Sequence, residues 1–562
     1  MVCWLQIQNV ISLQRKKGQF LLTFFLYKNM KKIIYITLIF LAACSSYEKP
    51  VDSSLETQVL LIGNGTEPQD LDPHIVTGVP ESKILMALLE GLVIRHPDGK
   101  SPLPGVAQSW DISSNGLIYT FNLRKNAKWS NGDTVDAHDF VYSWKRVLLP
   151  SLGSQYPDML YDIKNAEPFN KGEITDFNEV GVKAINDYQL QVTLANPAPY
   201  FIELLTHYTT RPVHKETIEQ YGSIDSVGTK WTRPGNFVGN GPFNLKEWQL
   251  NKVIEVEKSN TYWDNSAVKL NGIKFYPIDN VTREDLMFRS GQLHITGSIP
   301  QEKIDSYKTL YPEELKIFPY FGTYYYRINI NKPPLDEKLV RDALSLGLDR
   351  KELVDKVAKG GQEPAFSFTP PDKNGYYPTT KLEFNPTKAK QILNDLGYSE
   401  ENPFPKIELL YNTSEGHQKI AQAIQQMWKT NLGVDIELTN TDWKVYLSRQ
   451  QIGDYSISRA GWIGDYPDPK TFLDMMVTGR GNNQTGWSNQ EYDNLLKKAA
   501  NATNQTERFN YFNEAEKILM DEKPIIPIYT YTRMYMLHPD VKGWKSNLLD
   551  TRPYQNIELI RD

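Results

Sequence analysis

The sequence predicts an α/β protein of two or three domains. The chain has 562 residues, which is more than a single hydrophobic core normally serves. Hydrophobic residues make up 40% and charged residues 23%, the proportions of an ordinary soluble globular protein. In the second half of the chain, segments with helical periodicity alternate with strand-like segments. This order is typical of helices that cover a sheet.

The first half of the folded region begins with strands and turns. Residues 116–123 alternate apolar and polar side chains, as a half-buried strand does. The Asn-Gly-Asp sequence at residues 131–133 predicts a turn. Residues 137–148 predict a helix, because their apolar side chains recur at helical spacing on one face.

In the second half, several expected helices have recognisable ends. Asn385 followed by Pro386 predicts a helix start, and Gly397 predicts its end. Asp349 with Glu352 predicts a capping box ahead of another helix. The other expected elements are helices at 415–432 and 443–451 and strands at 316–331, 434–438, 455–459 and 525–531.

A glycine-rich segment, expected to be a loop, follows the predicted strand 455–459. The end of that strand and the segment carry Arg459, Trp462 and Asp465. Ligands of α/β proteins bind beyond the carboxyl ends of strands, so we expect these three side chains at a ligand site. The alternative is a surface turn that holds an Arg–Asp ion pair.

Composition and motifs favour binding over catalysis. A net charge of -5 gives no basic surface for nucleic acid. We find no zinc-protease, phosphate-loop, Cys-x-x-Cys or Gly-x-Ser-x-Gly motif, and no histidine pair with metal-ligand spacing. Asp465 and Asp468 could serve glycoside hydrolysis, but carboxylates at this spacing are common on polar loops. We therefore expect no enzyme activity, no catalytic residue, no metal and no cofactor.

Residues 30–43 predict a secretory signal peptide. Lys31 and Lys32 precede a short apolar run, and small residues then lead to Cys44. The run is shorter than the ~20 apolar residues of a permanent membrane helix. This arrangement resembles a bacterial lipobox, in which the cysteine receives a diacylglyceryl group. The alternative is a chance cysteine after an ordinary signal peptide.

Two expectations concern the residues around this signal. Residues 1–29 carry a second apolar run that does not fit a signal peptide, so we expect them to be an upstream extension before a true start at Met30. Residues 44–55 are largely polar and predict a tether between the lipid and the folded domain.

Short motifs spread along the chain together form one pattern. They are Leu71-Asp72-Pro73-His74, Gly78-Val79-Pro80-Glu81-Ser82, Glu90-Gly91-Leu92, Pro104-Gly105-Val106-Ala107, Phe121-Asn122-Leu123-Arg124, Trp129-Ser130-Asn131-Gly132, Asp139-Phe140-Val141-Tyr142-Ser143-Trp144, Thr323-Tyr324-Tyr325-Tyr326, Leu410-Tyr411-Asn412-Thr413-Ser414 and Arg459-Ala460-Gly461-Trp462. From about Gln58 to its end, the chain resembles the oligopeptide-binding proteins of ABC importers, within the bacterial solute-binding protein family 5 of dipeptide, oligopeptide and nickel binders.

The resemblance implies a two-lobed, hinged α/β fold with mixed sheets and an extra inserted N-terminal domain. Lobe I would be built from three parts of the chain, domain II would be inserted into it, and lobe III would be one later segment. The implied limits are 56–89, 217–320 and 530–562 for lobe I, 90–216 for domain II, and 321–529 for lobe III.

The resemblance also assigns roles in a peptide-binding cleft. Asp465 matches the carboxylate that pairs with the peptide α-ammonium, a group that needs a partner when it is buried. The backbone of Val79, Gly461 and Ile463 would hold the peptide as an extended strand. The remaining matches are cleft aromatics, at Tyr156, Tyr320, Tyr325, Trp443 and Trp462, and cationic groups for the peptide carboxylate, at Arg459 and His417.

The chain departs from the family pattern in several places. A cleft glutamate of other members is Thr77 here, and a lysine falls on Ala358 with Lys359 beside it. A cleft arginine is displaced to Arg449, with Gln450 in its place, and some members carry a cysteine pair where Gly322 and Ile463 stand. These changes leave the preferred peptide length open.

The family also implies partners and a location. We expect an extracytoplasmic monomer that is held at the membrane by its lipid and delivers short peptides to the permease of an ABC importer. Murein peptides, heme and nickel are alternative ligands of the same fold. A surface adhesin or chaperone is a second alternative, and a peptide hydrolase a third. Asp465 favours a ligand with a free amine over nickel.

Overall fold

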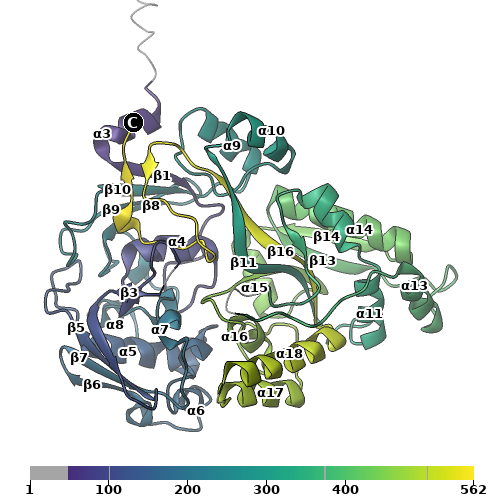
Figure 1. Ribbon diagram of the computed structural model, residues 1–562, viewed down its shortest axis with the longest axis horizontal. Helices are drawn as coiled ribbons and strands as arrows, with labels where there is room; N and C mark the ends of the chain where they lie inside the picture. The colour runs from purple at the N-terminus through teal and green to yellow at the C-terminus, as the bar shows by residue number, and fades with distance from the viewer. Residues whose placement is uncertain (1–47, 100, 372–374, 503) are drawn as a thin grey trace, which may run out of the picture.

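Two large masses connected by long strands make up the computed structural model of this protein (Figure 1). The structure describes residues 48–99, 101–371, 375–502 and 504–562, so Met30 and Cys44 lie outside the described residues. Most strands in these described ranges belong to three sheets, two with four strands and one with six. Within the described residues, no helix combines the length and the apolar composition that crossing a membrane requires.

The first sheet combines the beginning of the folded chain with its middle. Its order is β1 (Val59–Gly63), β10 (Gly272–Tyr276), β9 (Val253–Lys258) and β8 (Phe243–Gln249), and β1 runs parallel to β10. The end of the chain lies beside it, because the Gln58 side chain donates to Leu559 O at 2.8 Å. Helix α4 (Val79–Leu88) contacts β8.

The second sheet is antiparallel, and all of its strands come from the stretch of sequence between β1 and β8. Its order is β4 (Ala107–Ile112), β5 (Ile118–Leu123), β7 (Gln189–Thr193) and β6 (Val182–Asn186). Helix α5 (Ala137–Leu148) contacts β6 and β7, and it has the bounds that its apolar periodicity predicts. Asp136 and Asp139 form a reciprocal capping box at its start.

The third sheet is mixed and forms the core of the other mass. Its order is β12 (Glu363–Pro364), β16 (Ile525–Met536), β11 (Leu315–Ile328), β15 (Ile457–Ile463), β13 (Ile407–Asn412) and β14 (Ile436–Thr441). The helices of this mass include α11 (Lys338–Leu346), α13 (Pro386–Asp395), α14 (Glu415–Leu432), α15 (Trp443–Gln451), α17 (Gln490–Ala500) and α18 (Gln505–Glu522).

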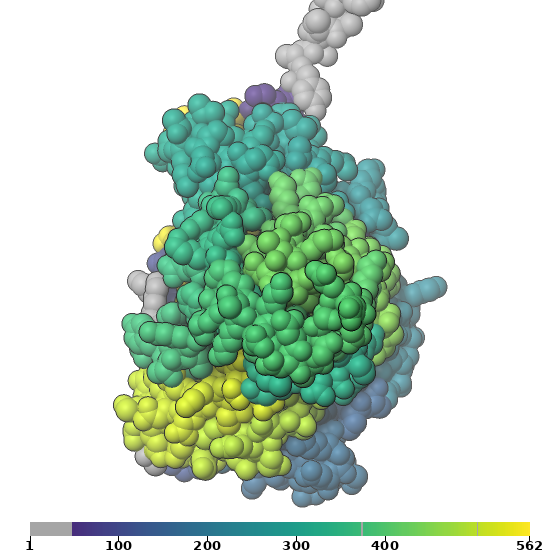
Figure 2. Space-filling model, turned by 90° about the vertical axis from the view of Figure 1, so that its right-hand side faces the viewer, coloured from purple at the N-terminus to yellow at the C-terminus, as the bar shows by residue number. Residues whose placement is uncertain are grey.

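Strands β11 and β16 connect the two masses, and the figure shows them passing side by side between the two (Figure 1). They pair from Leu315↔Met536 to Arg327↔Ile525, with a register shift between Pro319 and Thr323. The predicted limits of lobe III fall inside these two strands, and those limits stay a prediction. Seen from the side of the third sheet, the yellow-green surface of α17 and α18 meets the blue surface of the second-sheet domain (Figure 2).

The predicted helices around the third sheet are confirmed where a capping residue marks the helix start. Helices α14 and α15 have the predicted bounds, and Asn385 caps α13 through the Lys388 N–H. The Asp349 carboxylate accepts from the Glu352 N–H at 2.9 Å, but the helix that it caps is only Arg350–Leu353 and continues as a π-turn.

The predicted loop after residue 459 is wrong, because β15 continues through it to Ile463. Pairing with β11 decides the conformation: Ile463 lies opposite Gly322, and Trp462 lies opposite Thr323. Gly461 is required there by a close approach, since a Cβ atom at this position would lie 2.4 Å from the Tyr531 hydroxyl.

Candidate ligand-binding site

A cavity of about 530 Å³ lies between the two masses. Its walls come from α4 and the second-sheet domain on one side, from β15 and α14–α15 on the other, and from β11 and β16 at the hinge. The structure brings ten of the eleven predicted ligand residues to this cavity: Val79, Tyr156, Tyr320, His417, Trp443, Arg459, Gly461, Trp462, Ile463 and Asp465.

Tyr325 is the exception, and its prediction as a cleft aromatic is wrong. The side chain is fully buried, and its ring packs edge-on against Phe368 at 5.1 Å. Its hydroxyl accepts from Arg327 at 3.2 Å and lies 3.8 Å from the Met475 sulfur. Tyr325 therefore supports the wall from behind, while the Arg327 side chain lines the cavity.

Asp465 lies just beyond the hinge end of β15, where the two masses meet. Thr471 Oγ1 donates to one carboxylate oxygen at 3.0 Å, and His207 Nε2 lies 3.3 Å from the other. The side chain of Asp465 is only 9% exposed. Arg95, which comes from the same mass as His207, donates to the Asp465 carbonyl. The predicted amine-binding carboxylate is therefore buried and in contact with the opposite mass.

His207 and Arg95 are site residues that the sequence reasoning missed. His207 Nδ1 accepts from the Thr209 N–H at 3.4 Å, so the ring proton is on Nε2, which faces Asp465. Both residues are far from Asp465 in sequence and belong to no spacing pattern. Only the closed arrangement of the two masses reveals them.

Arg459 is a half-buried cation without a carboxylate partner among the described residues. Its guanidinium donates to the Tyr531 hydroxyl at 2.7 Å and to Asn412 Oδ1 at 3.4 Å, and it lies 4.9 Å from the Tyr324 ring centroid. Its Nε has no hydrogen-bond partner in the part of the chain that the structure describes. A buried guanidinium with a free donor favours an anion, and a carboxylate matches its geometry.

His417 lies next to this guanidinium but is not a second cation. Burial and the neighbouring charge of Arg459 hold the pKa of His417 well below its usual range. Its expected role as a cationic group is therefore corrected to that of a neutral imidazole, which can donate or accept one hydrogen bond at each nitrogen.

The cavity also contains a free strand edge. β13 pairs with β15 only through Leu409–Ile457 and Leu410–Ser458, so no described strand covers this edge of β15 further on. On the other edge, the Gly464 N–H donates to Phe321 O at 2.8 Å, which sets the phase of the β11–β15 ladder. Because bonding direction alternates along an antiparallel ladder, the N–H and C=O groups of Gly461 and Ile463 point away from β11.

Comparisons with known proteins agree with this geometry. Residues 101–484 match the family model "Bacterial extracellular solute-binding proteins, family 5 Middle". The chain belongs to this family. The periplasmic oligopeptide-binding protein OppA of Escherichia coli is 39% identical over 518 residues, which cover 90% of this chain and 93% of OppA. Such relatives are solute-binding transport proteins rather than enzymes.

Comparison with solved structures of relatives indicates whether the two masses of this family 5 protein are open or closed. Haemophilus influenzae OppA in complex with the peptide RPPGFSPFR has a TM-score of 0.86 at 35% identity, covering 90% of this chain and 99% of that one. The murein tripeptide binding protein MppA of E. coli has a TM-score of 0.85 at 36% identity, covering 90% and 98%. Its unliganded open form, with the same coverage and 35% identity, has a TM-score of only 0.61. The two masses, lobes of the family fold, are therefore in the closed arrangement.

One contact that closes this family 5 protein joins α4 to α15. Trp443 Nε1 donates to Glu81 Oε1 at 3.3 Å, and the Gln69 N–H donates to the same oxygen at 2.6 Å. Glu81 Oε2 is buried without a partner among the described residues, and burial raises the pKa of Glu81 to about 7. The packing requires Gly78, where a Cβ atom would lie 2.1 Å from Glu81 Oε2. A protonated Glu81 fits this site best.

Glu81→Gln is expected to flatten part of the pH dependence of stability. Because the folded pKa of about 7 is above the ordinary glutamate value of 4.5, the favourable neutral form is fully present below pH 4.5 and is lost as pH rises through 7. Glutamine stays neutral, so the variant should be more stable than the wild type by about 3 kcal/mol at pH 8 and equally stable at pH 4.5. At pH 8 it should therefore unfold at a higher temperature than the wild type. Scanning calorimetry of both proteins, with the exposed Glu401→Gln as control, measures the difference. Parallel pH curves for wild type and Glu81→Gln would contradict it.

A second set of contacts between the two masses lies outside the cavity. Lys470 Nζ donates to both carboxylate oxygens of Asp162, at 2.8 and 3.0 Å. Each of these two side chains is 13% exposed. The rings of Tyr200 and Tyr466 stack at 5.5 Å across the same boundary, and Lys470 Nζ lies 4.9 Å from the Tyr200 centroid. None of these four residues lines the cavity.

Lys470→Met is expected to weaken the binding of every closing ligand by a similar factor. The ion pair exists only in the closed arrangement, so its loss shifts the equilibrium toward the open form without touching the ligand. A partly buried pair of this kind contributes about 1 kcal/mol, or about fivefold in Kd. Titration calorimetry with several peptides measures this, with the exposed Lys517→Met as the matched control. A loss confined to one peptide would refute a closure role.

The departures from the family pattern have structural explanations. Thr77 and Gln450 line the cavity, and the Gln450 side chain donates to Arg459 O at 3.1 Å. Arg449 instead binds Glu408 at 3.0 Å and Asp454 at 2.9 Å, so its charge is already paired away from the cavity. Ala358 is fully buried and does not line the cavity.

Proposed function

We propose that this protein captures short peptides between its lobes and delivers them to the permease of an ABC importer. The observation that carries the proposal is the combination found in one cavity: a buried carboxylate at Asp465, an unpaired guanidinium at Arg459, and the free edge of β15 between them. A peptide has an amine, a carboxylate and a backbone with strand geometry, and so matches all three.

The free edge explains how different sequences bind alike. An extended peptide beside β15 can exchange main-chain hydrogen bonds with Gly461 and Ile463, and the first N–H groups of α4 at Val79 have no acceptor within the helix. Main-chain bonds do not depend on side chains, so affinity comes without sequence selection. Tyr156, Tyr320, Trp443 and Trp462 are proposed to wall the side-chain pockets.

The positions of the two charged residues suggest a length range. Arg459 lies on β15 and Asp465 two residues beyond its end, so the two are six residues apart, or at most about 20 Å between Cα atoms. An extended peptide of about six residues covers that distance, and shorter ones suffice where the Arg459 side chain reaches inward. Peptides of up to about six residues are proposed to be held at both ends.

The proposed cellular location is extracytoplasmic, with a lipid on Cys44 holding the protein near its permease. The signal-like residues 30–43 support it, as do the periplasmic oligopeptide-binding and murein peptide-binding proteins among the relatives. Mass spectrometry of the mature N-terminal peptide tests it: an unmodified Cys44 in the mature protein would reject the anchor.

Native mass spectrometry of the protein as purified tests the peptide proposal directly. A closed binding protein retains its ligand, so we expect a set of co-purified peptide masses, released by mild unfolding and sequenced. Murein peptides, heme or nickel would each give a distinct mass and would redirect the proposal within the same fold. No ligand, together with no binding of short peptides, would favour an adhesin or chaperone, and shortened peptides after incubation would favour a hydrolase.

A further inference from the structure

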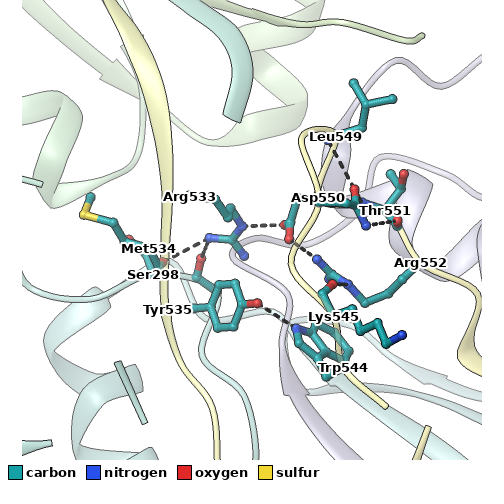
Figure 3. A network of polar contacts seen from close by, with 12 residues as sticks. Ser298, Arg533, Met534, Tyr535, Trp544, Lys545, Leu549, Asp550, Thr551 and Arg552 are labelled. Carbon is teal, nitrogen blue, oxygen red and sulfur yellow. Dashed lines mark hydrogen bonds and ion pairs between the residues drawn. The ribbon is translucent and has the colours of Figure 1, made fainter. Parts of the chain in front are cut away.

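A second charged group lines the cavity at the hinge. Asp550 is held between two arginines, with Arg533 Nε at 2.5 Å from one oxygen and Arg552 at 2.6 Å from the other, as Figure 3 shows. Arg533 Nη1 also donates to Gly297 O at 2.6 Å. Arg533 and Asp550 line the cavity, whereas Arg552 lies behind them against a small void.

Lys83 brings a third cation to this group. It lies one helical turn beyond Val79 on α4, and it lines both the main cavity and the small void together with Arg533 and Asp550. The described residues provide no hydrogen bond or ion pair for its ammonium. Burial, with the nearby charge of Arg533, lowers the pKa of Lys83 to about 8. Lys83 is half-buried, so its ammonium is a partly desolvated cation that lines the cavity without a directly bound anion among the described residues.

The local carboxylates do not balance these charges. Asp550 already accepts from both arginines, so it does not neutralise Lys83 fully. Glu284 is the other acid nearby, but the Gly297 and Ser298 N–H groups occupy its oxygens at 2.6 and 3.2 Å, and burial raises its pKa to about 7. The hinge wall of the cavity therefore has an excess of positive charge near neutral pH.

This hinge wall lies on the side of the cavity where Asp465 is proposed to bind the peptide amine. Arg533 lies two residues beyond Tyr531 on β16, so both side chains are on the same face of the strand. Tyr320 lies between the hinge wall and Asp465. Its ring centroid is 6.1 Å from that of Tyr531, and its hydroxyl is close enough to Arg533 and Asp550 to feel their charges. Tyr320 immediately precedes Phe321, whose carbonyl accepts from Gly464, the neighbour of Asp465.

We propose that Lys83 and Arg533 form a subsite for an acidic side chain at one of the first two positions of the bound peptide. This inference rests on the proposed peptide-binding function and adds a preference to it. The carboxylate would provide the anion that Lys83 lacks, and a buried cation gains most from such a partner. A glutamine of the same shape would provide only a neutral acceptor.

Peptide pairs that differ only in this group test the subsite. Ligand-free protein is titrated calorimetrically with Glu-Ala-Ala and Gln-Ala-Ala, Ala-Glu-Ala and Ala-Gln-Ala, and Ala-Ala-Glu and Ala-Ala-Gln. We expect the glutamate peptide to bind at least fivefold more tightly than its glutamine partner at the first or the second position. A ratio within twofold at both, or a preference found only at the third position, would overturn the proposal.

Variants assign the preference to Lys83. In Lys83→Met the ratio should fall to about one, and in Lys83→Arg most of it should remain, because the charge is kept. Lys183→Met removes the same charge from the exposed face of β6 and should retain the wild-type ratio. A ratio that persists in Lys83→Met would reject the subsite. If Ala-Ala-Ala does not bind at all, the proposed function itself fails and this inference fails with it, whereas binding of Ala-Ala-Ala without a glutamate preference rejects the subsite alone.

Discussion

Replacing Asp465 with alanine is expected to weaken peptide binding at least a hundredfold. The carboxylate is 9% exposed and closed off by the opposite lobe, so a peptide ammonium brought there would lose its water without regaining a partner. Removing one member of a buried ion pair costs about 3–5 kcal/mol, which corresponds to more than a hundredfold in Kd. Titration calorimetry with a tripeptide measures the effect.

Two controls separate the charge of Asp465 from its packing. Asp435→Ala removes an aspartate that is 64% exposed and should leave binding unchanged. An N-acetylated tripeptide, which lacks the ammonium, should bind wild type and Asp465→Ala with similar, weak affinity, because the pair is already missing. A loss below tenfold with the free tripeptide, or an equal loss with the acetylated one, would remove Asp465 from the amine site.

Local signals explain the parts of the fold that the sequence predicts well. The α14 and α15 helices start at Ser414 and Asp442, whose side chains accept from backbone N–H groups three residues on. Such caps, and the apolar periodicity of the helix that follows each one, depend only on residues that are close in sequence. The predicted bounds therefore agree with the structure without any knowledge of the tertiary fold.

Long-range pairing explains the parts that it predicts poorly. Residues 460–463 contain a glycine and precede another, so they suggest a loop, but β11 pairs with them from the hinge and extends β15. The same strand carries Tyr325. Tyr324 and Tyr325 are neighbours on β11 and face opposite sides of the sheet, and both are fully buried away from the cavity, so the strand pattern alone does not show which of its aromatic residues reach a ligand.

The site shows the same division. Family motifs lead to Asp465 and Arg459 because those residues occur in a recognisable order. His207, Arg95 and Lys83 have no motif, and they become site residues only when the other lobe closes on the cavity. The neutral state of His417 depends on the buried guanidinium beside it, which no local pattern reports.

Arg146→Met is expected to destabilise the protein by about 3–5 kcal/mol, the cost of leaving a buried charge without its partner. Arg146 on α5 forms a bidentate pair with Asp72, at 2.9 and 2.6 Å, and its side chain is fully buried. Both positions belong to family motifs or adjoin them, yet neither residue lines the cavity. The pair therefore attaches the segment before α4 to the second-sheet domain and has no ligand to bind.

Thermal unfolding of the variant measures this, with an expected fall in the midpoint of about 3–5 °C. Arg146→Lys keeps one charge but loses the second hydrogen bond and should show a smaller fall. Asp72→Asn combined with Arg146→Met removes both charges, so it should recover part of the loss, since the penalty comes from the unpaired carboxylate rather than from the missing pair. A double variant less stable than Arg146→Met would mean that packing of the Arg146 side chain, and not its charge, holds the two segments together.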